Sequence, residues 1–394
     1  MKNITGLLIL LMLISAGLGN ISAQTADEII SKHIEAHGGM ENWNAIQSMK
    51  ITGQFTAFSE TKPYTEVKAR GGKYFSDHYK GQHRVIEGCD GSVYWVNDPW
   101  FDYPFPHLAN DAEANVIRQK AVFCTPFFDY RDHGFKVEYQ GMDEAEGRDC
   151  HKLILTRENG LTETWFLDAE TFLEVMTLSQ WADFAAPESQ EAFYDDFREV
   201  NGVVIPFYTE RVFSIRHRVT QIEEIQFNTS PDPSLFEMPL SPEMERLSFM
   251  KGEWDVVLET MSRGGRLTFA DSTTSRIGFL PHKNFLQEDI TYATYFPIEK
   301  MNQITYNSGL NKYLFTTYNG FYSRLSVFQG DFAGDTLVLE DSQVRFNEDE
   351  ITDMGKYRIY PKDKNSMVVE LDQSRDDGAN WTTMQRFTYT RKND

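Results

Sequence analysis

The sequence predicts a mostly β protein whose antiparallel sheets curl into a half-barrel or barrel, in two successive domains. Three observations predict this class. Short runs of alternating apolar and polar residues recur along most of the chain, as strands require. Asn159-Gly160 separates two such runs and is the strongest hairpin signal. A proline-rich stretch at 228–242 interrupts the pattern, which restarts after it.

Residues 1–23 are typical of an export signal. Lys2 supplies a short positive start, Leu7–Ile14 is apolar, and Ala23 fits a small-residue cleavage site. The apolar run is too short to span a bilayer, so we expect cleavage rather than anchoring. No cysteine follows it closely, which excludes a lipidated N-terminus. We therefore expect a periplasmic or secreted protein with no integral membrane segment in its mature chain.

Helical signals are few and come early. Ala26–His37 carries apolar residues at helical spacing, with Thr25 and Glu28 as a capping box and Gly38-Gly39 as a stop. Further helices are expected at 40–46 and around 110–123. Strands are expected at 48–58, 65–79, 93–96, 135–139, 152–157, 161–167, 172–181, 191–200 and 203–227.

The prolines at 228–242 mark a domain boundary, because each removes a backbone donor and breaks a sheet ladder. We expect one domain at 24–240 and a second at 241–394. Regular short strands in the second are typical of a barrel. They are expected at 251–255, 265–277, 285–291, 301–307, 312–318, 322–329, 336–339, 355–360, 367–371 and 382–391.

The chain is acidic, with a net charge of −21, which disfavours nucleic acid and anionic membrane surfaces as partners. Cys89, Cys124 and Cys150 allow one disulfide and one free thiol, or three buried thiols, and spacing does not choose among these.

Residues 26–240 resemble the outer-membrane lipoprotein-sorting (LolA-like) family. The resemblance rests on Ile30–Gly39 with Trp43, on Tyr194–Phe207 (YDDFREVNGVVIPF) and on Asp232–Pro239 (DPSLFEMP). It implies an antiparallel half-barrel with helices plugging its concave face, which the family uses to shelter acyl chains.

Residues 244–394 resemble a calycin-like β-barrel family, related in shape to lipocalins. The resemblance rests on Leu247–Trp254 (LSFMKGEW), on Tyr306-Asn307 and on Phe387–Lys392 (FTYTRK). It implies a second antiparallel barrel that adds a pocket or a docking surface.

His33 and His37 lie four residues apart on one helical face, a spacing that suits zinc. Glu35 is not placed as in the metalloprotease motif, and no third ligand is visible in the sequence. We therefore expect neither a metal nor a cofactor. Haem in the second barrel would need His282 to face inward, although Pro281 before it favours an exposed turn.

Aromatic residues gather between Tyr94 and Phe105, where prolines hold the chain extended. Such a loop either lines the mouth of the half-barrel and grips a ligand or folds back as core. The candidate ligand-binding residues are Tyr94, Trp95, Trp100, Phe101, Tyr103, Phe105, Trp165 and Trp254.

The sequence favours an exported, non-enzymatic protein that shelters a hydrophobic small molecule or a lipoprotein acyl chain. One alternative is an interaction or scaffolding module with solid barrels. A second is a hydrolase of envelope lipid or glycan, although no serine-hydrolase, phosphate-loop or dinucleotide motif is present.

Overall fold

The computed structural model describes residues 25–101, 105–183, 186–213, 216–293, 297–320, 324–341, 354–376 and 378–392. The chain forms two compact units. The first holds residues up to 104 and 108–238, and the second holds 105–107 and 239–394. No helix within the described ranges is long and apolar enough to cross a membrane.

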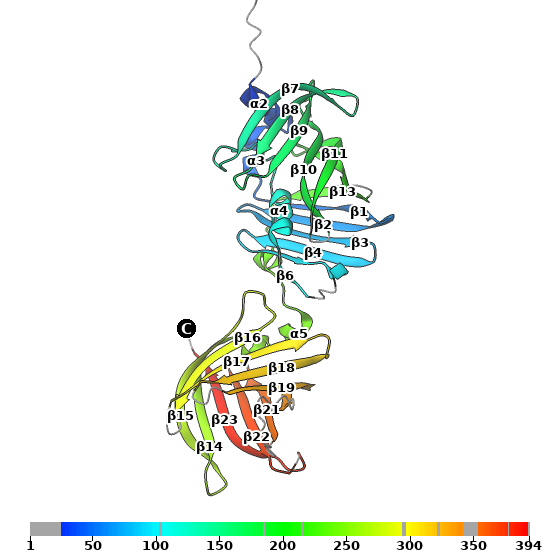
Figure 1. Ribbon diagram of the computed structural model, residues 1–394. Helices are drawn as coiled ribbons and strands as arrows, with labels where there is room; N and C mark the ends of the chain where they lie inside the picture. Colours follow the sequence, from blue (N-terminus) through cyan, green and yellow to red (C-terminus); the bar gives the residue numbers. More distant parts are fainter. Residues whose placement is uncertain are drawn as a thin grey trace, which may run out of the picture. The chain divides into compact units, whose positions relative to one another are not determined.

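The first unit is built on a large antiparallel sheet (Figure 1). In the described residues its order is β6-β5-β4-β3-β2-β1-β13-β12-β11-β10-β9-β8-β7. Pairing of β1 with both β2 and β13 joins the two ends of the meander. The strands are β1 (Ser48–Ala57), β2 (Glu60–Ala69), β3 (Lys73–Lys80), β4 (His83–Asp90), β5 (Tyr94–Asn97), β6 (His107–Leu108), β7 (Lys136–Ala145), β8 (Arg148–Thr156), β9 (Thr162–Asp168), β10 (Glu174–Asp183), β11 (Ala186–Val200), β12 (Val203–Phe213) and β13 (Arg216–Phe227).

Three helices pack against this sheet. They are α2 (Ala26–Ala36), α3 (Gly39–Ala45) and α4 (Asp111–Lys120), and a short 3-10 turn, η2 (Pro233–Phe236), closes the unit. Helix α4 contacts β4 and β5 on one side and β10 and β11 on the other. These strand pairs lie far apart in the sheet order, so the sheet must curl around α4. The curl creates a concave face, which is the half-barrel that the sequence predicted.

The second unit contains a closed antiparallel barrel in which β14 pairs with β23. Its strands follow chain order: β14 (Gly252–Met261), β15 (Leu267–Phe279), β16 (Leu286–Ala293), β17 (Pro297–Asn307), β18 (Lys312–Asn319), β19 (Arg324–Ala333), β20 (Thr336–Asp341), β21 (Met354–Asp363), β22 (Ser366–Ser374) and β23 (Thr382–Arg391). Two short helical turns, α5 (Pro242–Glu245) and η3 (Ser248–Met250), precede it.

The barrel interior is filled by its own side chains. Trp254, Tyr313 and Leu339 are fully buried in one continuous apolar core. The cavity inside measures about 30 Å³ and so has room for about two water molecules. A further hollow of about 450 Å³, lined by residues that include Lys300, Phe328 and Leu371, opens on the same barrel, so only the centre of the barrel is closed.

The local expectations are met in part: the strands expected at 65–79 and 203–227 are each two strands, and β4 was not expected. The capping box of Thr25 and Glu28 is present, and α2 ends at Ala36 before Gly38, whose φ is +97°. The mostly β class is confirmed. The hairpin at Asn159-Gly160 joins β8 to β9, and Gly160 takes the left-handed conformation with φ +82°. Arg157 N–H donates to the Leu161 carbonyl, so the loop is longer than a two-residue turn.

Candidate functional site

The concave face of the first unit encloses a hollow of about 220 Å³. Its strand residues come from β1, β2 and β9–β13, mostly at alternate positions, because successive side chains of a strand point to opposite faces. On β12, for example, Ile205, Thr209 and Arg211 face the hollow. The lining includes Met49, Ile51, Tyr64, Glu66, Lys68, Lys120, Phe123, Cys124, Arg157, Glu163, Trp165, Glu174, Trp181, Tyr194, Ile205, Arg211 and Ile222.

The apolar part of the wall lies around α3 and the middle of the sheet. Trp43, Met49, Ile51 and Ile205 are buried in one cluster, against which Phe123 packs. The same side chains line the hollow. This part of the wall provides the apolar surface that the sequence predicted.

The rest of the wall is charged, which the sequence did not predict. Lys68 Nζ lies 2.9 Å from Glu66 Oε1, and Lys120 pairs with Glu87 at the edge of the hollow. Arg157 pairs with Glu163. Burial would raise the pKa of Glu87, but Lys120 and His78 more than offset it and bring that pKa to about 2. Each of these acids is paired with a base, and the pairing offsets part of the cost of burying its charge.

Arg211 differs from its neighbours in the hollow. Of the charged side chains that line it in the described part of the chain, only Arg211 has no ion pair. Its guanidinium carbon lies 4.8 Å from the centre of the Trp181 ring. Its Nε is buried and has no hydrogen-bond partner. The hollow therefore contains one positive charge that no described carboxylate balances.

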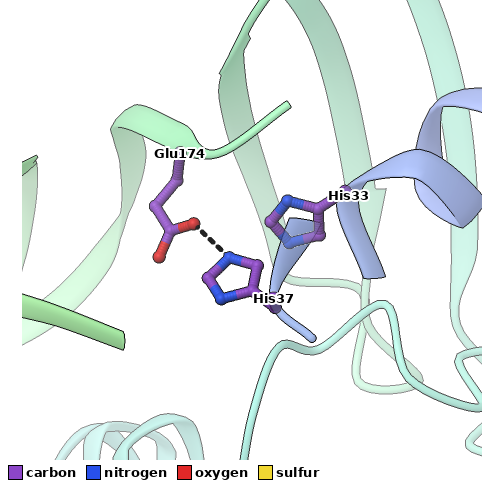
Figure 2. Close-up of side chains that lie close together, drawn as sticks. All are labelled: His33, His37 and Glu174. Carbon is purple, nitrogen blue, oxygen red and sulfur yellow. Dashed lines mark hydrogen bonds and ion pairs between the residues drawn. The ribbon is translucent and has the colours of Figure 1, made fainter. Parts of the chain in front are cut away.

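His33, His37 and Glu174 lie close together, and two of them, His37 and Glu174, belong to the wall of the hollow (Figure 2). The histidines come from α2 and its C-cap, and Glu174 is the first residue of β10. Their side-chain ligand atoms all lie within 4.8 Å of one another. All three residues are less than 9 % exposed. His37 and Glu174 line the hollow, whereas His33 lies behind them.

Each ring nitrogen of the two histidines has a hydrogen-bond partner. His33 Nδ1 lies 2.8 Å from the Phe172 carbonyl oxygen, and His37 Nδ1 lies 2.8 Å from that of Val204. His33 Nε2 is 3.0 Å from Thr125 Oγ1, and His37 Nε2 is 2.7 Å from Glu174 Oε2.

The electrostatics of the group follow from burial and from these contacts. Burial and the neighbouring His37 lower the pKa of His33 to about 4. Burial also disfavours the protonated form of His37, but the negative charge of Glu174 outweighs this effect and raises the pKa of His37. Burial would raise the pKa of Glu174, and His37 instead brings it to about 2.

The aromatic loop does not line the hollow, as far as its side chains are described. Val96 faces α4, so strand alternation turns Trp95 to the opposite face. There Trp95 Nε1–H donates to the Phe236 carbonyl, and Gly88 across the strand pair leaves space for its ring. Tyr94 is half-buried beside Ile117. Pro99 opens a 3-10 turn, η1 (Pro99–Phe101), instead of an extended loop.

The remaining rings are spread over both units. Trp100 is 38 % exposed and packs on Phe58, with ring centres 5.2 Å apart. Phe105 belongs to the second unit and lies edge-on to Tyr306. Tyr103 and the side chain of Phe101 lie outside the described residues. The aromatic loop therefore provides no described ring to the hollow, and ligand binding by its residues stays a prediction.

Of the two isolated tryptophans, only Trp165 lines the hollow. Its Nε1–H donates to Glu163 Oε2 over 3.0 Å. Trp254 is packed in the barrel core, where its Nε1–H donates to the Met250 carbonyl. His282 is exposed in the turn between β15 and β16 and does not face the barrel interior. Cys89, Cys124 and Cys150 are all free thiols.

Sequence reasoning missed Glu174 and Arg211. Glu174 lies 137 residues from His37, and only the fold brings the two together. Arg211 had a local signal: it shares the strand parity of the apolar Val203, Ile205 and Phe213. A basic residue on the buried face of a strand is the pattern that would have found it.

Among known protein families, one described as a protein of unknown function (DUF1579) matches residues 240–391. No curated protein matches the sequence. The calycin-like resemblance of the second unit stays a prediction.

Similar solved structures include a LolA superfamily protein from Nitrosomonas europaea. It is 12 % identical, with a TM-score of 0.39, over 55 % of this chain and 99 % of that one. A putative outer membrane lipoprotein-sorting protein domain from Vibrio parahaemolyticus is 9 % identical, with a TM-score of 0.34, over 53 % and 95 %. A DUF3598 family protein from Nostoc punctiforme is 9 % identical, with a TM-score of 0.23, over 89 % and 99 %.

Proposed function

We propose that the hollow of the first unit binds an amphiphilic anion, such as a fatty acid or an acidic lipid, and that the protein is an exported, non-enzymatic binding protein of the cell envelope. The observation that carries this proposal is the guanidinium of Arg211, which has no ion pair and lies in a hollow whose wall is in part apolar.

The apolar wall favours an acyl chain. Met49, Ile51, Phe123 and Ile205 present aliphatic and aromatic surface to the hollow. Each methylene that moves from water onto such a surface contributes about 0.8 kcal/mol. An acyl chain that places a few methylenes there gains enough to offset the cost of its own ordering.

The charged wall favours an acidic head group. The four acids in and beside the hollow, Glu66, Glu87, Glu163 and Glu174, are each already paired with a base. A cationic guest would therefore find no vacant carboxylate among them, whereas an anionic guest would satisfy Arg211. Arginine suits this role because its planar fork binds a carboxylate or phosphate through two parallel hydrogen bonds.

The test compares two ligands with the same chain. Palmitate and hexadecanol are titrated into wild-type protein and Arg211→Gln by displacement of a fluorescent fatty acid. We expect wild type to prefer palmitate, and the variant to bind palmitate about tenfold or more weakly with hexadecanol little changed. A charge-assisted hydrogen bond contributes about 1.5–3 kcal/mol, which sets that magnitude.

Arg198→Gln is the matched control, because Arg198 is exposed on β11 and pairs with Asp196. It should bind both ligands as wild type does. Failure of wild type to bind either ligand would refute the proposal. Equal loss in the two arginine variants would show that overall charge, and not the hollow, attracts the fatty acid.

A further inference from the structure

We propose that His33, His37 and Glu174 form a binding site for one zinc ion at the wall of the hollow. The sequence showed only the two histidines, and the fold adds a carboxylate from β10. The ligand atoms of the three side chains are already gathered within 4.8 Å of one another. A site that is assembled before the ion arrives avoids most of the cost of ordering its ligands.

The tautomers of both histidines favour metal binding. A carbonyl oxygen only accepts hydrogen bonds, so Nδ1 of each ring donates its proton, to Phe172 in one case and to Val204 in the other. In a neutral ring the lone pair then lies on Nε2. His37 Nε2 lies 2.7 Å from Glu174 Oε2 and carries the proton of that hydrogen bond, which zinc displaces when it binds. Metal-bound histidines have this same outer contact, which fixes the ring and its tautomer.

The donor set selects the ion. Two imidazole nitrogens and one carboxylate oxygen suit zinc, whereas calcium and magnesium prefer oxygen ligands throughout. Without a metal, His33 Nε2 contacts the Thr125 hydroxyl, and His37 Nε2 is hydrogen-bonded to Glu174. Zinc lies about 2.0 Å from a histidine nitrogen, so the Thr125 side chain must turn away from His33 Nε2 to admit the ion.

The position of the group gives the ion access. His37 and Glu174 line the hollow, so an ion bound between them would be reached from its interior. Three protein ligands leave a fourth position on a tetrahedral ion, and the hollow would supply a water or a small anion to it. Purely structural zinc sites usually have four protein ligands, so this site is of the open kind.

The test uses the full chain after treatment with a chelator and removal of that chelator. Zinc is titrated against a chromophoric competitor, and Co²⁺ is added separately to record its visible spectrum. We expect one tight equivalent of zinc per chain, a tetrahedral Co²⁺ band, and no competition from Mg²⁺ or Ca²⁺. His37→Gln and Glu174→Gln should each weaken zinc binding more than tenfold.

His151→Gln is the control, because His151 is also buried in the first unit but lies outside the cluster. It should bind zinc as wild type does. The site is disproved if wild type takes up no tight equivalent, or if the two cluster variants keep full affinity. If those variants do not fold, the Co²⁺ spectrum of wild type decides the matter. Palmitate binding through Arg211 is measured separately, so either idea can fail alone.

Discussion

His78 is a buried imidazole that makes the first unit sensitive to acid. It lies on β3, is 5 % exposed, and packs edge-on against Phe55 at 4.9 Å between ring centres. Burial lowers its pKa to about 3. Glu87 opposes this shift, and Lys120, Lys80 and Arg218 reinforce it. The folded protein therefore holds His78 neutral at every pH at which most proteins are studied.

This burial predicts a loss of stability as the pH falls. Below pH 6.5 the unfolded chain takes up a proton on His78 that the folded chain refuses, so acid favours unfolding. Between pH 7 and pH 5 the free energy of unfolding should fall by up to about 2 kcal/mol on this account. Over the same pH range, the free energy of unfolding of His78→Gln should fall by about 2 kcal/mol less than that of wild type. Urea unfolding of both proteins at the two pH values, with a chelator present, measures the difference.

The exposed His83 provides the comparison for this experiment. His83→Gln removes an imidazole that is exposed at the start of β4, so it controls for the loss of a histidine as such. An equally steep loss of stability in His78→Gln and wild type would contradict the assignment. Glu87 adds a separate loss at lower pH, since its pKa of about 2 lies below that of a carboxyl in the unfolded chain.

The turn between α2 and α3 is the element that positions His37. Gly38 has φ +97°, and a Cβ built there would lie 2.1 Å from the Gly202 carbonyl oxygen. Trp43 Nε1–H donates to the His37 carbonyl and ties the two helices together. The close approach of Gly38 to Gly202 brings the end of α2 against the turn between β11 and β12. This close contact explains why both positions are glycine.

We therefore predict that Gly38→Ala destabilises the first unit strongly. Positive φ alone costs a residue with a side chain about 1–3 kcal/mol, and the clash with Gly202 adds to that. Gly147→Ala is the matched variant, because Gly147 has φ +72° with nothing within 4 Å of its Cβ position. Urea unfolding should show a clearly larger loss for Gly38→Ala. Equal losses would mean that the contact with Gly202 has no energetic weight.

Elements were predictable where their signals are local. The capping box at Thr25 and Glu28 and the Asn159-Gly160 turn involve residues close in sequence, and both are present in the structure. The pairing of β1 with β13 joins residues such as Ile51 and Ile225, and no local pattern specifies it. Glu174 is likewise far from the two histidines in the sequence, so no local pattern links it to them. No described ring of the aromatic loop lines the hollow, because aromatic side chains concentrate in cores as readily as in binding sites.

At the scale of the whole chain, the barrel should fold without the first unit. Its continuous apolar core is made of residues between Met244 and Tyr389, together with Leu240 at its edge. Closure of β14 on β23 leaves no open edge in its sheet order. All the residues of that core are therefore retained when the chain is cut before Pro239.

We predict that residues 239–394, expressed alone, are soluble and unfold in one cooperative transition. The experiment follows Trp254 fluorescence during urea unfolding, because that indole is fully buried in the core. The midpoint should match that of the corresponding transition in the full chain, and binding of palmitate and zinc should be absent from the fragment. A fragment with an exposed Trp254 and no cooperative transition would show that the barrel depends on the first unit for its core. The contact of Phe105 with Tyr306 would then be the first interaction to restore, by adding back the segment that carries it.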